Sequence, residues 1–356
     1  MARMTIRSDP FYRALLQQAW AEGRDIQYGI AHGLLHPDRA WPDLLETVGH
    51  LPWRHWHHPE AVSGGKIGTW LVRRTTHDAT LRDRVAQGWY GAEFALQDLF
   101  GSPPRGQSTW LRGMAHWHLY SAYQAASSAF PTADDLRSLV VAHPADCQMS
   151  RGEQWVLHHP DLLTWHPFHE GSGALRRAPW WGLVSLVPNQ AAMRAYTDAC
   201  WAYRGRAPVL GAAIAQTVSQ AVRQPPPSSV AMMQSLMTAV HRLTPRHALV
   251  RSLVATLWRR RQYGITFEEQ CQWIAHQTHF FPYDHVVPNL LVQLLVFGYG
   301  AGTWDSTLDL LPKAGWDTVT NTIIVGTLLG LQGLQPVRCL AALESEIDAT
   351  FRQLSE

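Results

Sequence analysis

Residues 315–321 read Gly-Trp-Asp-Thr-Val-Thr-Asn and hold the residue types in this chain that are best suited to chemistry. The Asp317 carboxylate is flanked by the hydroxyls of Thr318 and Thr320, and an apolar helix is predicted to follow. Oxygen ligands on the first turn of a buried helix can hold a hard cation or a phosphate. The same residues also fit an ordinary helix start, in which Asp317 or Thr318 satisfies orphan backbone amides.

Two further segments carry candidate groups. Thr76 and Asp78 place a hydroxyl and a carboxylate at an apparent helix start, as ligands or as caps. The stretch 172–182 reads Ser-Gly-Ala-Leu-Arg-Arg-Ala-Pro-Trp-Trp-Gly. A glycine-led turn before small residues and arginines can approach an anionic substrate, and a proline-kinked core helix explains the same residues.

Together these three segments resemble the ADP-ribosylglycohydrolase family, named for the enzyme that reactivates dinitrogenase reductase. That family is all-α and holds two magnesium or manganese ions between an early Thr-Asp-Asp-Thr motif and a late Gly-(Gly/Trp)-Asp-Thr-Asp-(Thr/Cys)-Asn motif. The likeness in order and spacing extends across residues 64–334 and includes Val287-Pro288-Asn289 and the small-residue stretch 208–215.

The resemblance assigns roles to particular positions. It implies that Asp78 and Asp317 are catalytic. It implies metal-side positions at Thr76, His77, Asp78, Asp317 and Thr320. Substrate binding is expected at Gly173 and Trp316, with Arg176 or Arg177 facing a diphosphate.

The chain departs from the family motifs at three positions. His77 stands where the family has an aspartate, Ala79 where it has a threonine, and Val319 where it has a second late aspartate. Bridging carboxylates make a pair of divalent ions tolerable, and imidazole favours zinc over magnesium. We therefore expect one divalent ion (magnesium, manganese or zinc) or none.

Three functions remain open on the sequence. The first is an enzyme that cleaves a glycosidic bond to an ADP-ribosyl or related nucleotide group. The second is a catalytically inactive pseudoenzyme that binds a nucleotide or a protein partner. The third is a biosynthetic enzyme that uses the same cleft without two-magnesium chemistry. An ADP-ribose-like or other small molecule is the expected ligand, and the first function, a hydrolase, is preferred as the single assignment.

The composition narrows the class of protein. The 356 residues are 46% hydrophobic and 16% charged, and the net charge of +2 includes no basic block longer than Arg259-Arg260-Arg261. A nucleic-acid binder is therefore not expected. The longest apolar stretch, 286–301, is interrupted by Pro288, Asn289 and Gln293, which predicts a buried helix rather than a membrane span. The first residues show no apolar signal region, and the expected location is the cytoplasm.

Helical periodicity dominates, and no sustained alternation predicts a sheet. The chain is expected to form an all-α, compact, single-domain multi-helix bundle of the ADP-ribosylglycohydrolase type over residues 1–356. The proline run 225–227 is interpreted as a connection inside that domain. Helices are predicted near 9–21, 80–100, 108–129, 132–142, 189–204, 208–222, 227–242, 245–261, 266–277, 286–298, 317–332 and 336–354.

Overall fold

The structure, a computed structural model, describes five stretches of the chain and a set of helical positions before them. The stretches are 132–142, 150–159, 166, 168–185 and 187–334, and the helical positions are 84, 87, 88, 91, 92, 94–96 and 99. These described residues are mainly helical, and their only β pairing is an isolated bridge between Gly171 and His285. The expectation of an all-α protein is confirmed for this part of the chain.

Most of the predicted helices are present with ends shifted by a few residues. In chain order the helices are α7 (Ala133–Ala142), α8 (Arg151–His158), α9 (Gly173–Val184), α10 (Pro188–Cys200), α11 (Arg206–Arg223), α12 (Ser229–Leu243), α13 (Ala248–Gln262), α14 (Phe267–Thr278), α15 (Val286–Tyr299), α16 (Trp304–Leu308), α17 (Leu310–Ala314) and α18 (Thr318–Leu331). The helices predicted near 9–21, 108–129 and 336–354 lie outside the described residues.

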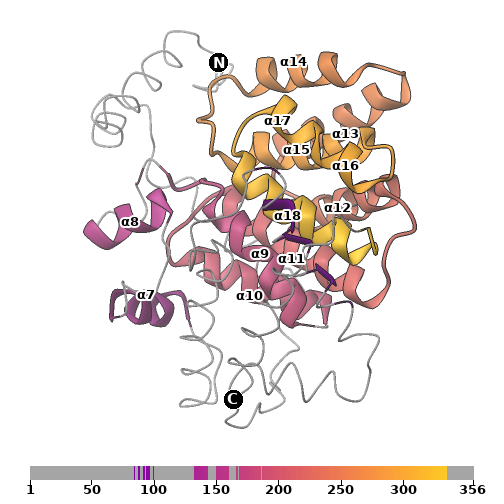
Figure 1. The fold of residues 1–356 in the computed structure, drawn as a ribbon. Helices are drawn as coiled ribbons and strands as arrows, with labels where there is room; N and C mark the ends of the chain where they lie inside the picture. The colour runs from indigo at the N-terminus through magenta and orange to yellow at the C-terminus, as the bar shows by residue number, and fades with distance from the viewer. Residues whose placement is uncertain are drawn as a thin grey trace.

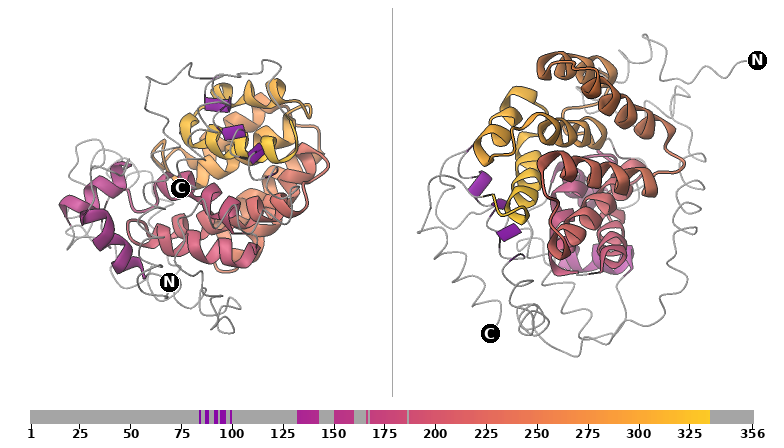
Figure 2. Two further views of the ribbon diagram at one scale, coloured as in Figure 1. Left: turned by 60° about the horizontal axis from the view of Figure 1, so that its bottom comes forward. Right: turned by 90° about the vertical axis from the view of Figure 1, so that its right-hand side faces the viewer.

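Helix α18 lies in the middle of the bundle in Figure 1, and both views of Figure 2 show this yellow helix beside the indigo helical positions of residues 84–99. It packs against α9 and α11 on one side and against α15, α16 and α17 on the other. The position follows from its composition, since residues 320–331 are almost all apolar or small and every one of them is buried. A helix that is apolar around its whole circumference has no face suited to water and belongs in the core.

Helix α15 is buried in the same way over residues 286–298. The prediction that its apolar sequence forms a core helix is therefore confirmed. No described helix combines the length and the apolar character that crossing a membrane would require.

Small residues on α18 allow a second helical segment to approach very closely. A Cβ atom built on Gly330 would overlap the backbone carbonyl oxygen of Gln87, and one built on Gly326 would overlap that of Gly91. The pairing is antiparallel, because residue numbers rise from Gln87 to Gly91 while they fall from Gly330 to Gly326. The glycines of α18 therefore allow the two helical backbones to pack directly against each other.

Candidate functional site

A pocket of about 500 Å³ opens where the N-terminal ends of α9 and α18 meet. Its walls come from segments that are far apart in the sequence. The lining residues are Ser150, Gly152, Phe168, Gly171, Ser172, Gly173, Arg176, Tyr203, Tyr283, Asp284, Trp316, Asp317, Thr318 and Val319. Gly173, Arg176, Trp316 and Asp317, which the resemblance singled out, thus line one pocket.

Asp317 is the N-cap of α18 and also part of the pocket wall. Its Oδ1 atom accepts a hydrogen bond from the Thr320 backbone N–H at 3.1 Å, and Oδ2 accepts one from the Thr320 hydroxyl at 2.6 Å. The Ser172 hydroxyl donates to the same Oδ2 atom. The helix-cap interpretation of Asp317 is therefore confirmed, and only 8% of the residue is exposed to solvent.

The turn before α18 directs Trp316 to the pocket. Gly315 and Trp316 both adopt positive φ angles, 79° and 66°. The Thr318 amide then donates to the Trp316 carbonyl at 2.9 Å around Asp317, whose φ of −76° and ψ of 81° form an inverse γ-turn. A positive φ at a residue as bulky as tryptophan is a strained conformation that the surrounding structure must hold.

Asn289 ties this turn to the opposite wall of the pocket. Its Oδ1 atom accepts from the Asp317 amide at 2.9 Å and from Asn321 Nδ2 at 2.8 Å. Its Nδ2 atom donates to the carbonyls of Tyr283 and His285 at 2.9 and 2.8 Å. Asn289 is fully buried, so these bonds place the late motif and the 283–285 segment in fixed relation to each other.

Glycine is required at the start of α9. A Cβ atom on Gly173 would overlap the Tyr203 hydroxyl and press on the Ser150 hydroxyl, which are hydrogen-bonded to each other. Burial raises the pKa of Tyr203, so its phenol is neutral and remains able to donate. Tyr203 and Ser150 form a hydroxyl-rich corner of the pocket beside the N-terminus of α9.

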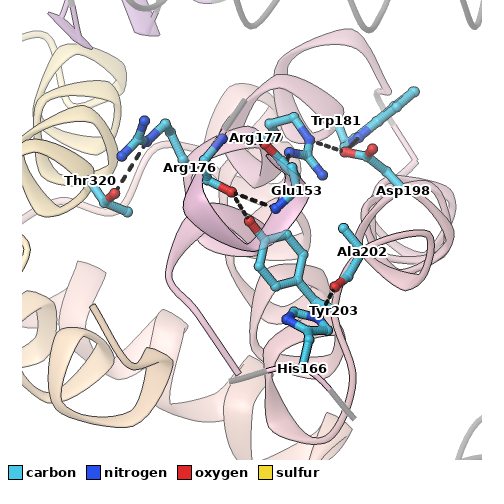
Figure 3. A network of polar contacts seen from close by, with 10 residues as sticks. Glu153, His166, Arg176, Arg177, Trp181, Asp198, Ala202, Tyr203 and Thr320 are labelled. Carbon is cyan, nitrogen blue, oxygen red and sulfur yellow. Dashed lines mark hydrogen bonds and ion pairs between the residues drawn. The ribbon is translucent and has the colours of Figure 1, made fainter. Parts of the chain in front are cut away.

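The two adjacent arginines of α9 point to different places (Figure 3). Arg176 lines the pocket and donates from Nε to the Thr320 hydroxyl at 3.3 Å. Arg177 lies outside the pocket and forms buried ion pairs with Glu153 of α8 and with Asp198 of α10, the latter at 2.9 Å. Of the two residues expected to face a diphosphate, the structure places only Arg176 at the pocket.

The described residues that follow the early motif in sequence pack against the end of α18 opposite to the pocket. Thr76, His77 and Asp78 lie outside the described residues, and their metal and catalytic roles stay predictions. The described helical positions that follow the motif run antiparallel to α18, and Gln87 contacts Gly330 near the end of α18 opposite to Asp317. Thirteen residues of helix separate Asp317 from Gly330, a distance of about 20 Å.

The described part of the pocket does not fit a divalent ion. Asp317 already accepts three hydrogen bonds from protein groups, and the Thr320 hydroxyl donates to Asp317 while accepting from Arg176. Val319 contributes an apolar side chain to the lining. Among the described residues no three His, Cys, Asp or Glu side chains are grouped so that they could hold a metal ion.

Two carboxyl-bearing residues near the pocket were not identified as site residues from the sequence. Asp284 lines the pocket next to Tyr283, which is exposed. Glu170 lies behind the wall, where its carboxylate accepts from Arg206 Nη1 at 2.6 Å and from His285 Nε2 at 2.9 Å. The only sequence signal for either was proximity, since Asp284 shortly precedes Val287-Pro288-Asn289 and Glu170 precedes the stretch 172–182.

The buried surroundings shift the pKa values of one acidic group and two imidazoles behind the pocket. Arg206 and His285 hold the pKa of Glu170 well below its usual range despite its burial. Burial lowers the pKa of His285 to about 4, and the Glu170 carboxylate opposes this shift without cancelling it. Burial likewise lowers the pKa of His166 to about 3.

These shifts predict a loss of stability on acidification. Below about pH 6.5 the unfolded chain binds protons at His166 and His285 that the folded protein does not, so the free energy of unfolding falls. Each histidine contributes a slope of about 1.4 kcal/mol per pH unit until the pH reaches its folded pKa. Glu170 acts in the same direction at lower pH, because its lowered pKa means that the unfolded chain binds a proton at this carboxyl before the folded protein does.

Urea unfolding at pH 7.5, 6.5, 5.5 and 4.5 measures this slope. A His285→Asn variant should lose one of the two contributions and show a shallower dependence than the wild type. An unchanged slope in that variant would contradict the assignment of a lowered pKa to His285.

Comparison of the chain with protein-family models, with curated proteins and with solved structures finds no match in any of the three.

Proposed function

We propose that the pocket between α9 and α18 binds an ADP-ribosyl or related nucleoside phosphate group and that the protein cleaves a glycosidic bond of that ligand. The support is the meeting of Gly173 and Arg176 with Trp316 and Asp317 at one pocket, although about 140 residues separate the two pairs. The resemblance to ADP-ribosylglycohydrolases expects these positions to face a common substrate, and it supplies the ligand class.

The chemistry of the lining suits each part of such a ligand. Arg176 offers a guanidinium, and the N-terminal end of α9 at Ser172 and Gly173 carries the positive end of the helix dipole. Both favour a phosphate. Trp316 and Tyr283 offer aromatic surface for a base, and Asp284, Thr318 and Ser150 offer partners for ribose hydroxyls.

Hydrolysis at this pocket needs a water, a group that accepts its proton, and a way to hold the sugar. Water adds to the anomeric carbon, and the bond to the leaving group breaks with its electron pair on that group. We assign the role of proton acceptor to Asp284, the second carboxylate among the described lining residues. Asp317 then orients the pocket through Ser172 and Thr320.

Calorimetric titration with ADP-ribose tests the binding step, with and without magnesium, manganese or zinc. Arg176→Ala is expected to weaken binding by about tenfold or more, since it removes a charge-assisted contact to phosphate. Arg259→Ala provides a matched control, because Arg259 is an exposed arginine on α13 and does not line the pocket. Absence of ADP-ribose binding by the wild type, or equal affinity in both variants, overturns the proposed site.

A second function, ligand binding without turnover, is favoured by two observations. Asp317 is tied up as a helix cap, and Val319 presents an apolar side chain where the family has a carboxylate. Release of ADP-ribose from an ADP-ribosylated arginine peptide separates the two functions. Binding of ADP-ribose with no release from the peptide, at any of the three metals, identifies a binding protein rather than a hydrolase.

A further inference from the structure

A buried cluster of charged and aromatic side chains lies directly behind the pocket wall. Glu170 Oε1 accepts from the backbone N–H of Arg206 at 2.7 Å, and Oε2 accepts from the Arg206 guanidinium at 2.6 Å and from His285 Nε2 at 2.9 Å. Phe281 stacks on the His285 ring with centroids 3.7 Å apart and planes inclined by 14°. None of these four side chains lines the pocket.

Glu170 and His285 belong to two short paired segments, and the neighbouring residues Ser172 and Asp284 line the pocket. Gly171 and His285 form the isolated antiparallel bridge. The Ser172 amide donates to the Asp284 carbonyl at 2.6 Å, and the Val286 amide donates to the Glu170 carbonyl at 2.9 Å. With only these bonds in the ladder, the pairing is too short to be stable alone. The Glu170–His285 contact adds a side-chain link across it.

The position of the Glu170 carboxylate is fixed from the far side as well. Gly205 adopts a φ of 63°, and a Cβ atom there would overlap the carboxylate. The guanidinium of Arg206 lies over the Phe281 ring at 5.8 Å. His169 is the remaining titratable neighbour that acts on both Glu170 and His285. The carboxylate therefore occupies a site built for it, and a buried charge so tightly enclosed needs a reason to be retained.

We propose that Glu170 and His285 are positioning residues, which set Ser172 and Asp284 on facing segments of the pocket wall and thereby control ligand affinity without touching the ligand. This inference rests on the proposed function for its ligand, ADP-ribose. The geometry that Glu170 and His285 maintain does not depend on the proposed function.

The two ring nitrogens of His285 make different contacts, which allows the positioning role to be separated from ordinary stabilisation. Nδ1 accepts the Val287 amide at 3.1 Å and caps α15, and Nε2 faces Glu170. His285→Asn retains an oxygen that can cap the helix and loses the contact with Glu170. His285→Gln carries an amide nitrogen that reaches Glu170 and gives up the cap.

We expect one variant, His285→Asn, to change mainly the affinity for ADP-ribose, and the other, His285→Gln, to change mainly the stability. His285→Asn should bind ADP-ribose about tenfold more weakly, the equivalent of one hydrogen bond to a charged group, while remaining folded. His285→Gln should keep an affinity near that of the wild type while unfolding at a lower temperature. Glu170→Gln should resemble His285→Asn in affinity. Affinities that simply follow the melting temperatures of the three variants overturn the proposal.

Amide hydrogen exchange gives a readout that needs no ligand. His285→Asn should speed exchange at the Ser172 and Val286 amides and leave the amides in the middle of α11 unchanged, and His285→Gln should not. If the wild type binds no ADP-ribose but this selective exchange occurs, the proposed function fails and the positioning role stands. If exchange at the Ser172 and Val286 amides is the same in both variants, the positioning role is overturned, whatever the ligand.

Discussion

Asp198→Ala is expected to lower the free energy of unfolding by about 3–5 kcal/mol, the cost of breaking a buried ion pair from one side. Asp198 accepts from Arg177 Nε at 2.9 Å and from Trp181 Nε1 at 3.0 Å (Figure 3). The side chains of Arg177 and Asp198 are only 8% and 3% exposed. After truncation, Arg177 retains Glu153 but loses one of its two carboxylates where water cannot replace it.

Chemical denaturation of the purified variant measures this effect. Asp134→Ala is the matched control, because Asp134 pairs with Arg137 at 3.2 Å on the surface, where its side chain is 81% exposed. An exposed pair of this kind is worth under about 1 kcal/mol. Equal losses in the two variants would show that the Arg177 cluster is not a buried, water-excluded ion pair.

The buried group of Arg177, Asp198 and Glu153 also allows a test of whether its charges stabilise the fold or only need to be paired. Replacing Arg177, Asp198 and Glu153 together with apolar residues of similar volume should recover most of the stability that Asp198→Ala loses, because no charge is left buried without a partner. A triple variant as unstable as Asp198→Ala would indicate that the ion pairs themselves are strongly stabilising.

Gly330→Ala is expected to destabilise the protein by about 3 kcal/mol, at the upper end of the range for overpacked sites. The new methyl group would meet the backbone carbonyl of Gln87, which cannot move aside as a flexible side chain can. The higher helix propensity of alanine, about 1 kcal/mol, offsets part of the clash. The variant should show this loss as a lower midpoint of urea unfolding.

Gly264→Ala separates steric overlap from the loss of glycine freedom. Gly264 has a φ of 75° and no atom within 4 Å of the Cβ that alanine would add. Its substitution should cost about 1 kcal/mol, which is the backbone term alone. A Gly330→Ala variant no less stable than Gly264→Ala would contradict the close crossing of α18 with the helical segment that contains Gln87 and Gly91.

The local properties of the chain were readable from the sequence. The apolar composition of 286–298 and 320–331 predicts core helices, and both stretches are buried in the structure. The short polar side chain of Asp317 before an apolar run predicts an N-cap, and Asp317 accepts the Thr320 amide. These features depend on neighbours within a few residues, so the sequence contains the information that decides them.

Some elements gave no sufficient local signal. Helix α8 begins with a capping box at Ser150 and Glu153, yet its eight residues are too few to show a clear period. Tyr203 and Asp284 enter the pocket from the end of α10 and from the loop before α15. The place of Asp284 depends on the Gly171–His285 bridge, which joins segments more than a hundred residues apart, and on Asn289, which bonds to Asp317 across 28 residues of sequence.

Arg176 and Arg177 show which properties the sequence determines and which ones only the tertiary structure decides. The sequence determined that two arginines follow the glycine-led start of α9, and it could not choose between them as the one that faces a phosphate. Successive residues on a helix point about 100° apart, so the rotation of α9 about its own axis decides which arginine faces the pocket. Glu153 and Asp198 set that rotation by burying Arg177 between α8 and α10, which leaves Arg176 at the pocket. Only the tertiary structure brings those two carboxylates to α9.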